Sequence, residues 1–132
     1  MKIYFDESKI GINLKEEYEI PETFKVFRYA YKENAEAAKA LLIVKFQLKN
    51  MDGKRNIRFS KIPMRALFHF RGFMSKYWLL DEKTNTCMGV YRWATIADAE
   101  RYSKSIAMKF MKKRSVKESL SYRIQKIEKE PV

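Results

Sequence analysis

Four aromatic residues with polar edges occupy two neighbouring segments of the chain, Tyr77 and Trp78 in the first and Tyr91 and Trp93 in the second. If these segments are adjacent antiparallel strands, the rings could line a flat pocket for a small aromatic or apolar ligand. Tyrosine hydroxyls and indole N–H groups would supply its few polar contacts. The same rings are equally typical of a core or a dimer interface. The sequence therefore predicts ligand binding by Trp78 and Trp93, and leaves the core interpretation open beside it.

Three further side chains close to these rings could take part in chemistry. Lys76 and Arg92 lie on the same two segments and could hold an anionic oxygen of a ligand, although exposure to solvent is the simpler expectation for each. His69 is the only histidine and could act as a general base near neutral pH. It lies close to the end of an expected helix, where a surface histidine is the commoner outcome.

Several classes of site lack the residues they need. One histidine and one cysteine cannot supply the usual ligand set of zinc, and no EF-hand spacing occurs, so we expect no metal site. Phosphate loops and serine or cysteine nucleophile motifs are absent. We therefore expect no cofactor; a haem held by His69 alone is conceivable but unsupported.

The chain also shows no sign of a membrane or secreted protein. No apolar run approaches the roughly 20 residues that span a bilayer, and residues 1–9 lack the apolar stretch of a signal peptide. The single cysteine, Cys87, excludes an internal disulfide. We therefore expect a cytoplasmic protein and no membrane partner.

A β-hairpin is the element expected to position the rings. Two apolar-aromatic runs, residues 73–80 and 87–93, flank the short polar connector 81–86. Alternation divides the bulky side chains of the first run between the two faces of the strand, with Met74, Trp78 and Leu80 on one and Phe73, Tyr77 and Leu79 on the other. One layer of helices covers only one face of a sheet, so a second copy of the chain is a good candidate for the other face.

The remaining elements follow from periodicity and capping residues. Residues 41–48 alternate as a strand, and Asn50, Met51, Asp52 and Gly53 break it. Ser60 is expected to cap a helix over residues 61–71. Thr95 is expected to cap one longer helix whose apolar positions recur as far as residue 110, and residues 120–124 read as a half-buried strand. The order of elements from residue 41 is that of a ferredoxin-like βαββαβ sandwich, an α+β fold with an antiparallel sheet.

Residues 1–40 look like an N-terminal appendage to a ferredoxin-like domain of residues 41–132. Residues 2–5 and 10–14 predict either a small hairpin or an extended arm, and apolar positions three and four apart predict a helix over residues 24–38. The appendage has a net charge of −1 and the domain has +13, which together give the +12 of the whole chain.

The basic charge leaves a second function class open. A basic surface attracts nucleic acid, and a ferredoxin-like sheet with exposed aromatics can stack bases. The candidate contact residues form one run: Lys109, Lys112, Lys113, Arg114 and Lys117. The sequence Arg71-Gly72-Phe73 begins like an RNA-binding signature and departs from it at Met74. A non-catalytic structural dimer is a third alternative.

The hairpin and the helix after it resemble a known family. Residues 71–78 (RGFMSKYW), 89–93 (GVYRW) and 99–102 (AERY) are similar, in order and spacing, to the YdhR-like monooxygenase group of the dimeric α+β barrel superfamily. The resemblance covers roughly residue 41 onward. Met88 stands where the group commonly has a glycine, and residues 1–40 are not part of its pattern.

The resemblance implies a fold, an assembly and a reaction. Two ferredoxin-like protomers would pair sheet against sheet as a homodimer and enclose an apolar pocket, which the extra N-terminal segment could fill or cap. A bound phenol or enol would lose a proton to His69, Tyr77 or Tyr91 and then react directly with dioxygen, without a cofactor. The protein would contribute desolvation and placement.

Overall fold

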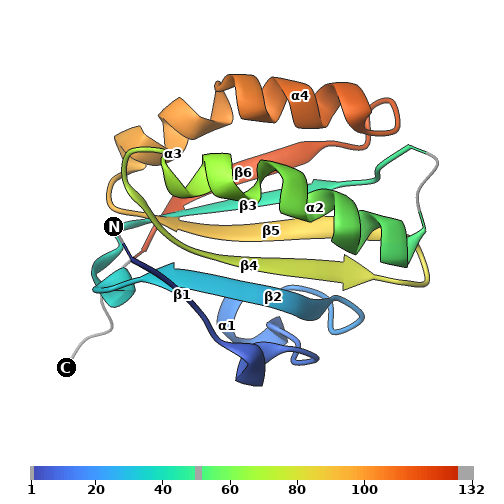
Figure 1. Cartoon of the computed structure of the whole chain (residues 1–132), viewed down its shortest axis with the longest axis horizontal. Helices are drawn as coiled ribbons and strands as arrows, with labels where there is room; N and C mark the ends of the chain where they lie inside the picture. Colours follow the sequence, from blue (N-terminus) through green and yellow to red (C-terminus); the bar gives the residue numbers. More distant parts are fainter. Residues whose placement is uncertain (1, 50–51, 128–132) are drawn as a thin grey trace.

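The chain forms a six-stranded antiparallel sheet in the order β1–β2–β4–β5–β3–β6 (Figure 1). The computed structural model describes residues 2–49 and 52–127. The strands are β1 (Ile3–Phe5), β2 (Lys25–Lys32), β3 (Ala40–Phe46), β4 (Phe73–Asp81), β5 (Thr86–Trp93) and β6 (Ser121–Lys126). The helices are α1 (Lys15–Tyr18), α2 (Gly53–Phe68), α3 (Ile96–Ser103) and α4 (Ile106–Arg114), with short 3₁₀ turns η1 (Glu7–Lys9) and η2 (Ala35–Ala37).

The ferredoxin-like prediction is confirmed. From β3 onward the chain runs strand, helix, strand, strand, helical segment, strand, and the four strands lie in the order β4–β5–β3–β6. The predicted hairpin is β4 and β5, which pair from Phe73–Trp93 to Asp81–Thr86. The hairpin lies in the middle of the sheet, between β2 and β3, so its aromatic residues have a paired strand on either side.

The N-terminal segment extends the same sheet. The helix predicted over residues 24–38 is wrong, because residues 25–32 form β2 and pair with the free edge of β4. The alanine-rich end makes only the turn η2. The predicted hairpin of residues 2–5 and 10–14 is also wrong, since β1 pairs with β2 and residues 10–14 form no strand. The boundary proposed after residue 40 falls at the start of β3.

The helices differ from prediction in where they begin and break. α2 begins at Gly53, well before the expected start, because Asp52 accepts a hydrogen bond from the Arg55 amide (2.9 Å) and caps it. The long helix expected from Thr95 is two helices: Thr95 caps α3 as predicted, and Ser105 caps α4. The predicted break at Asn50 and Met51 lies outside the described residues.

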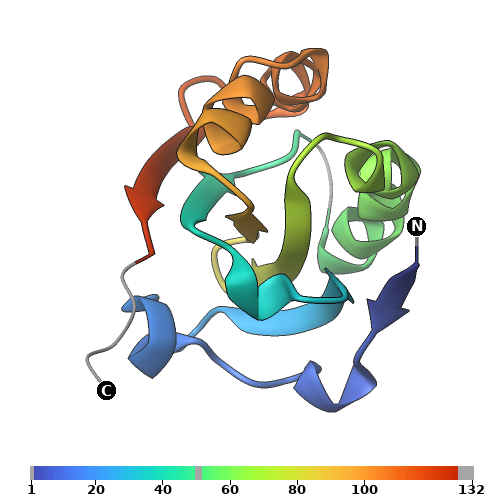
Figure 2. The same ribbon diagram turned by 90° about the vertical axis from the view of Figure 1, so that its left-hand side faces the viewer.

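All three long helices, α2, α3 and α4, cover one face of the sheet (Figures 1 and 2). Their buried side chains, including Leu67, Tyr102 and Met108, pack with Trp78, Tyr91 and other sheet residues into one core. Phe73 belongs to this core, although alternation placed it on the other face. The ladder shifts register between Phe73 and Ser75, and such a bulge turns one side chain over.

The leading segment covers much of the opposite face. Leu14, Ile20 and Phe24 are buried there against Leu41, Ile43, Leu79 and Val90, which forms a second core. Figure 2 shows this segment across the sheet from α2 and α4. This face of the sheet therefore has a partial cover from its own chain, in line with the expectation that the N-terminal segment could fill or cap the space on this side.

Tyrosines occupy the rest of that face, near its β1–β2 edge. The ring centroids of Tyr29 and Tyr77 are 4.1 Å apart, those of Tyr29 and Tyr31 are 5.5 Å apart, and those of Tyr4 and Tyr31 are 5.4 Å apart, all in stacked geometry. All four side chains are half-buried. We call Tyr4, Tyr29, Tyr31 and Tyr77 the tyrosine row.

Within the described ranges, no helix is both long and apolar enough to cross a bilayer.

Candidate functional site

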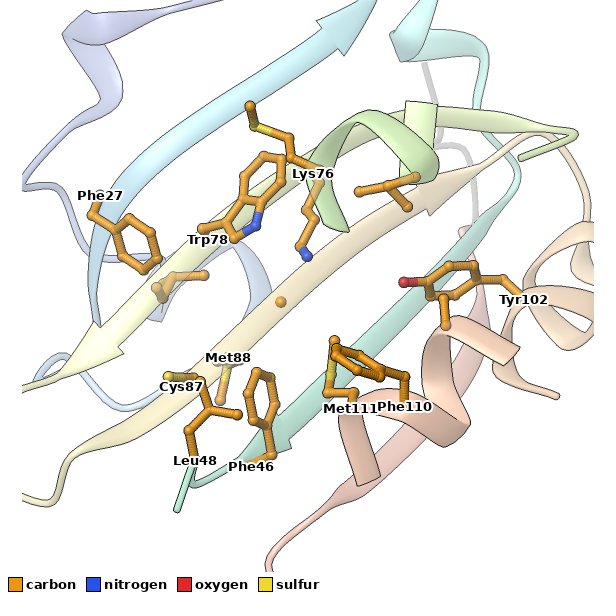
Figure 3. A pocket seen from close by; sticks show the side chains of 15 residues that line it. Phe27, Phe46, Leu48, Lys76, Trp78, Cys87, Met88, Tyr102, Phe110 and Met111 are labelled. Carbon is orange, nitrogen blue, oxygen red and sulfur yellow. The ribbon is translucent and has the colours of Figure 1, made fainter. Parts of the chain in front are cut away.

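A largely apolar pocket lies between the helix-covered face of the sheet and helices α2 and α4 (Figure 3). The cavity inside it measures about 50 Å³, several times the roughly 10–15 Å³ that one water needs. Its walls come from strands β2 to β5, helices α2, α3 and α4, and Leu48 just after β3. The lining residues are Phe27, Phe46, Leu48, Met64, Leu67, Lys76, Trp78, Leu79, Cys87, Met88, Gly89, Tyr102, Ala107, Phe110 and Met111. Among the wall residues that the structure describes, only Lys76 ordinarily carries a charge at neutral pH.

Lys76 lies on β4 with its side chain directed into this pocket (Figure 3). It is 6% exposed. Its amine nitrogen lies 4.4 Å from the ring centroid of Trp78 and 4.3 Å from that of Tyr91. Within the described ranges, no carboxylate and no hydrogen-bond acceptor pairs with this amine. A buried lysine with only ring faces around it is rare, because burial of an unpaired ammonium costs several kcal/mol.

The surroundings of Lys76 favour its neutral form. Burial lowers its pKa well below the ordinary value, and the positive guanidinium of Arg28 lowers it further. Cys87 acts weakly in the opposite direction. The thiol itself is neutral as well, because burial raises the pKa of Cys87 to about 12. Burial in this pocket thus favours the uncharged form of both the amine and the thiol.

Gly89 makes the room that Lys76 occupies. It is paired with Trp78 on the neighbouring strand and lines the pocket. A Cβ at this position would lie 2.7 Å from the Tyr91 ring and 3.1 Å from Cε of Lys76. Because Gly89 has no side chain, the Lys76 side chain has room beside the rings of Trp78 and Tyr91.

Two tyrosines add hydroxyl groups near the amine. Tyr102 of α3 lines the pocket. Its ring centroid lies 5.2 Å from that of Tyr91 and 5.0 Å from that of Trp93. The two hydroxyls interact and burial raises the pKa of both tyrosines, so both stay protonated. The contact falls short of a directed hydrogen bond, which leaves the Tyr91 hydroxyl without a partner in the described part of the chain.

The structure separates the residues that the sequence placed in one site. Lys76 and Trp78 line the pocket, and Tyr91 lies directly behind Lys76. Trp93 is fully buried in the core and does not line it. Tyr77 and Arg92 lie on the opposite face of the sheet, since Arg92 is paired with Ser75 and Leu41 there.

His69 lies outside the pocket. It ends α2 as its C-terminal cap and is exposed. The pocket therefore offers no imidazole to a haem iron. In the described part of the chain, no three His, Cys, Asp or Glu side chains gather closely enough to hold a metal ion.

Sequence reasoning missed the helix-borne half of the pocket. Tyr102 was noted only within the segment 99–102 that resembles the family, and Met64 and Met111 were assigned to no site. α2 carries one methionine, Met64, and α4 carries two, Met108 and Met111. Such flexible side chains are common at adaptable apolar sites, so their presence on both helices was the available signal.

The basic run lies on the outer surface of the helical layer. Lys109, Lys112, Lys113 and Arg114 are exposed on α4, and Lys117 is exposed just beyond it. Base stacking would need exposed aromatics on the sheet, and the sheet rings Trp78 and Trp93 are buried beneath those helices. The sheet rings are therefore covered on the side of the basic run, where Phe110 of α4 is a partly exposed ring with Arg114 over it. The geometry gives no support to base stacking on the sheet.

Comparisons with known proteins identify the fold. No protein-family model matches the chain, and no curated protein matches it by sequence. Among solved structures, a ferredoxin-fold protein from Listeria monocytogenes 4b F2365, described as related to antibiotic biosynthesis monooxygenases, superposes with a TM-score of 0.63 at 8% identity. That match covers 80% of this chain and 64% of the other.

Two further structures agree. The heme-degrading enzyme LmHde from Listeria monocytogenes matches with a TM-score of 0.58 at 15% identity, covering 76% of this chain and 68% of that one. A monooxygenase-like protein from Listeria innocua gives 0.59 at 11% identity, covering 76% and 61%. This chain thus spans about two thirds of the matched chains or less. The resemblance to monooxygenase-like ferredoxin-fold proteins, predicted from the hairpin, is confirmed at the level of the fold.

Proposed function

We propose that this protein binds a small aromatic or apolar ligand in the pocket beneath α2 and α4 and promotes its oxidation by dioxygen without a cofactor. The observation that carries the proposal is the pocket itself, an apolar cavity in the sheet-to-helix space with a single amine directed into it. Pockets of this composition, apolar with few polar groups, are typical of small-molecule sites. The monooxygenase-like descriptions of structures with this fold add the reaction type.

The reaction requires an electron-rich ligand. A phenol or enol with an adjacent CH₂ group donates its hydroxyl proton toward a base, and the resulting anion reacts with dioxygen. One oxygen atom enters the ligand as a ketone and the other leaves as water, so no outside reductant is consumed. The Lys76 amine faces the cavity and, in the neutral form that burial favours, is a hydrogen-bond acceptor for this proton, while Trp78 supplies a flat wall.

The base proposed from the sequence changes with this geometry. His69 and Tyr77 do not face the pocket, and the Tyr91 hydroxyl is protonated and buried behind Lys76. We therefore assign Tyr91 the role of shaping the lysine environment, and we assign Arg92 and Trp93 no direct contact with the ligand.

Filling the pocket tests the proposal. Ala107→Phe places a ring in the cavity from α4, whereas Ile106→Phe places the same ring at an adjacent position that is 83% exposed. We expect the first variant to abolish quenching of tryptophan fluorescence by anthrone and oxygen uptake with it, and the second to retain both. Equal binding and uptake in the two variants would contradict the proposed site.

A dimer through the tyrosine row is a separate proposal. Among the described residues, Ser75 Oγ and Arg92 Nε are buried on this face without a hydrogen-bond partner. A second copy of the chain could cover the row and supply partners. We expect a dimer by sedimentation that resists high salt, and a monomer for Tyr31→Glu but not for Tyr122→Glu on the exposed β6 surface. A wild-type monomer at micromolar concentration would refute this assembly, and with it the structural-dimer alternative.

A further inference from the structure

We propose that Lys76 is a nucleophile that captures a small apolar aldehyde or ketone as an imine inside the pocket. This inference rests on the pocket of the proposed function and names a chemical class of ligand for it. It differs from simple ligand binding because the contact is a covalent bond to one identified nitrogen.

The position of the amine is the first argument. Lys76 is almost fully buried, yet its nitrogen faces the cavity and not protein backbone (Figure 3). Its neighbours there are the faces of Trp78 and Tyr91. In the described part of the chain it has neither a carboxylate nor a hydrogen-bond acceptor, so no structural pair explains why a lysine is kept at this position.

The state of the amine is the second argument. Lysine becomes nucleophilic when it is desolvated in an apolar pocket or placed beside another cation. Both conditions hold at Lys76, where burial is the larger influence on its pKa and the Arg28 charge is the second. The free lone pair is therefore available at neutral pH to a far greater extent than on a surface lysine.

The bonds balance without an outside reagent. The nitrogen of Lys76 attacks the carbonyl carbon, the two N–H protons pass to the carbonyl oxygen, and that oxygen leaves as water while a C=N bond forms. The Tyr102 hydroxyl stays protonated and lies in the cavity wall, where it can donate a hydrogen bond to the departing oxygen. A protonated imine would lie between the Trp78 and Tyr91 rings, whose faces attract cations.

The pocket wall favours a carbonyl over an anion. A carboxylate would need further hydrogen-bond donors, and the wall around Lys76 is composed almost wholly of aliphatic, aromatic and thioether groups. Ring faces also repel negative charge. The free space of about 50 Å³ suits a short chain such as butanal, whereas a ring system as large as anthrone also needs the open side of the pocket.

The experiment is reductive trapping. The protein is incubated with butanal and cyanoborohydride at pH 7, and peptide mass spectrometry follows butyl groups on Lys76 and on the exposed Lys109 and Lys112. Each unit by which a lysine pKa falls raises its neutral fraction about tenfold. We expect Lys76 to be labelled first and at least about tenfold faster than the two surface lysines. The Lys76→Met variant should lack this fast gain of one butyl group in its protein mass.

The outcomes separate this inference from the proposed function. Fast labelling of Lys76 that Ala107→Phe abolishes and Ile106→Phe preserves supports both. Anthrone binding by fluorescence together with labelling of Lys76 no faster than the surface lysines overturns the imine and leaves the pocket standing. The imine is also overturned if butyrate protects Lys76 from labelling at a lower concentration than butanol does. That result would mean that the lysine is a cation that binds an anionic ligand. Absence of both anthrone binding and labelling refutes the pocket itself.

Discussion

Replacement of Lys76 by methionine is expected to stabilise the protein. Lys76 is buried among apolar groups and, in the described part of the chain, has no polar partner. Burial of a polar group without a compensating hydrogen bond costs about 1–3 kcal/mol. Methionine has a similar length and is uncharged, so Lys76→Met removes this cost and keeps most of the packing against Trp78 and Tyr91.

The gain should depend on pH in a defined direction. The folded-state pKa of Lys76 lies below its unfolded value, so between the two values the unfolded chain binds more protons and the stability of the wild type rises with pH. Below the folded-state pKa the whole penalty is present, and above the unfolded value, about 10.4, it is gone. The advantage of Lys76→Met should therefore be largest at low pH and shrink toward pH 10.

Urea denaturation at several pH values between 6 and 9.5 measures this difference. The upper limit avoids the region where the raised pKa values of Tyr91 and Tyr102 make folding stability fall as pH rises. At pH 7 we expect the free energy of unfolding to increase by about 1–3 kcal/mol, or roughly 3–6 °C in melting temperature for each kcal/mol. Lys109→Met, at an exposed position, is the control and should change neither quantity. A loss of stability in Lys76→Met, or a gain that does not vary with pH, would show that Lys76 has a partner or remains charged.

Three other substitutions test the packing that surrounds the site. Gly89→Ala should cost about 1–3 kcal/mol by urea denaturation, because its Cβ meets the Tyr91 ring at 2.7 Å; an unchanged midpoint would show that the ring moves freely. Leu14→Ala should cost about 2–5 kcal/mol by the same assay, since Leu14 is 1% exposed beneath the sheet; a neutral result would mean that the leading segment is detached. Asp52→Ala should cost about 1 kcal/mol through the lost cap of α2, measured as reduced helical circular dichroism and a lower melting temperature; no change would place the start of the helix elsewhere.

The central fold could be predicted because several local signals agreed. Alternating residues marked β3, β4 and β5, Thr95 capped α3, and the order of these elements admits few topologies. The N-terminal segment gave no such agreement. In residues 24–38 the apolar positions fit a helical period, yet the edge of β4 was unpaired, and pairing with it satisfied a full row of backbone groups. That long-range contact overrode the local pattern.

The site could be predicted only in part, because a face of a strand is not a local property. Tyr77 and Trp78 are neighbours in sequence and lie on opposite sides of the sheet. The bulge between Phe73 and Ser75 turns the Phe73 side chain to the helix-covered face, against simple alternation. The burial of Lys76 depends on Gly89, which lies on β5 opposite Trp78 and leaves room for Cε of Lys76. From the sequence alone, Lys76 was expected to be exposed to solvent. The pairing of β4 with β5 overturns this expectation.

The location of the pocket bears on how assembly and chemistry relate in this protein. The pocket lies on the helix side of the sheet, while the tyrosine row and the leading segment lie on the other side. A second protomer on the tyrosine row would therefore contribute no residue to the pocket wall. Ligand binding and assembly should then be separable, with Tyr31→Glu leaving anthrone binding intact and Ala107→Phe leaving the sedimentation behaviour intact. If the monomeric variant instead lost ligand binding, the two faces of the sheet would have to be coupled through β4, the strand that carries Tyr77 on one side and Lys76 on the other.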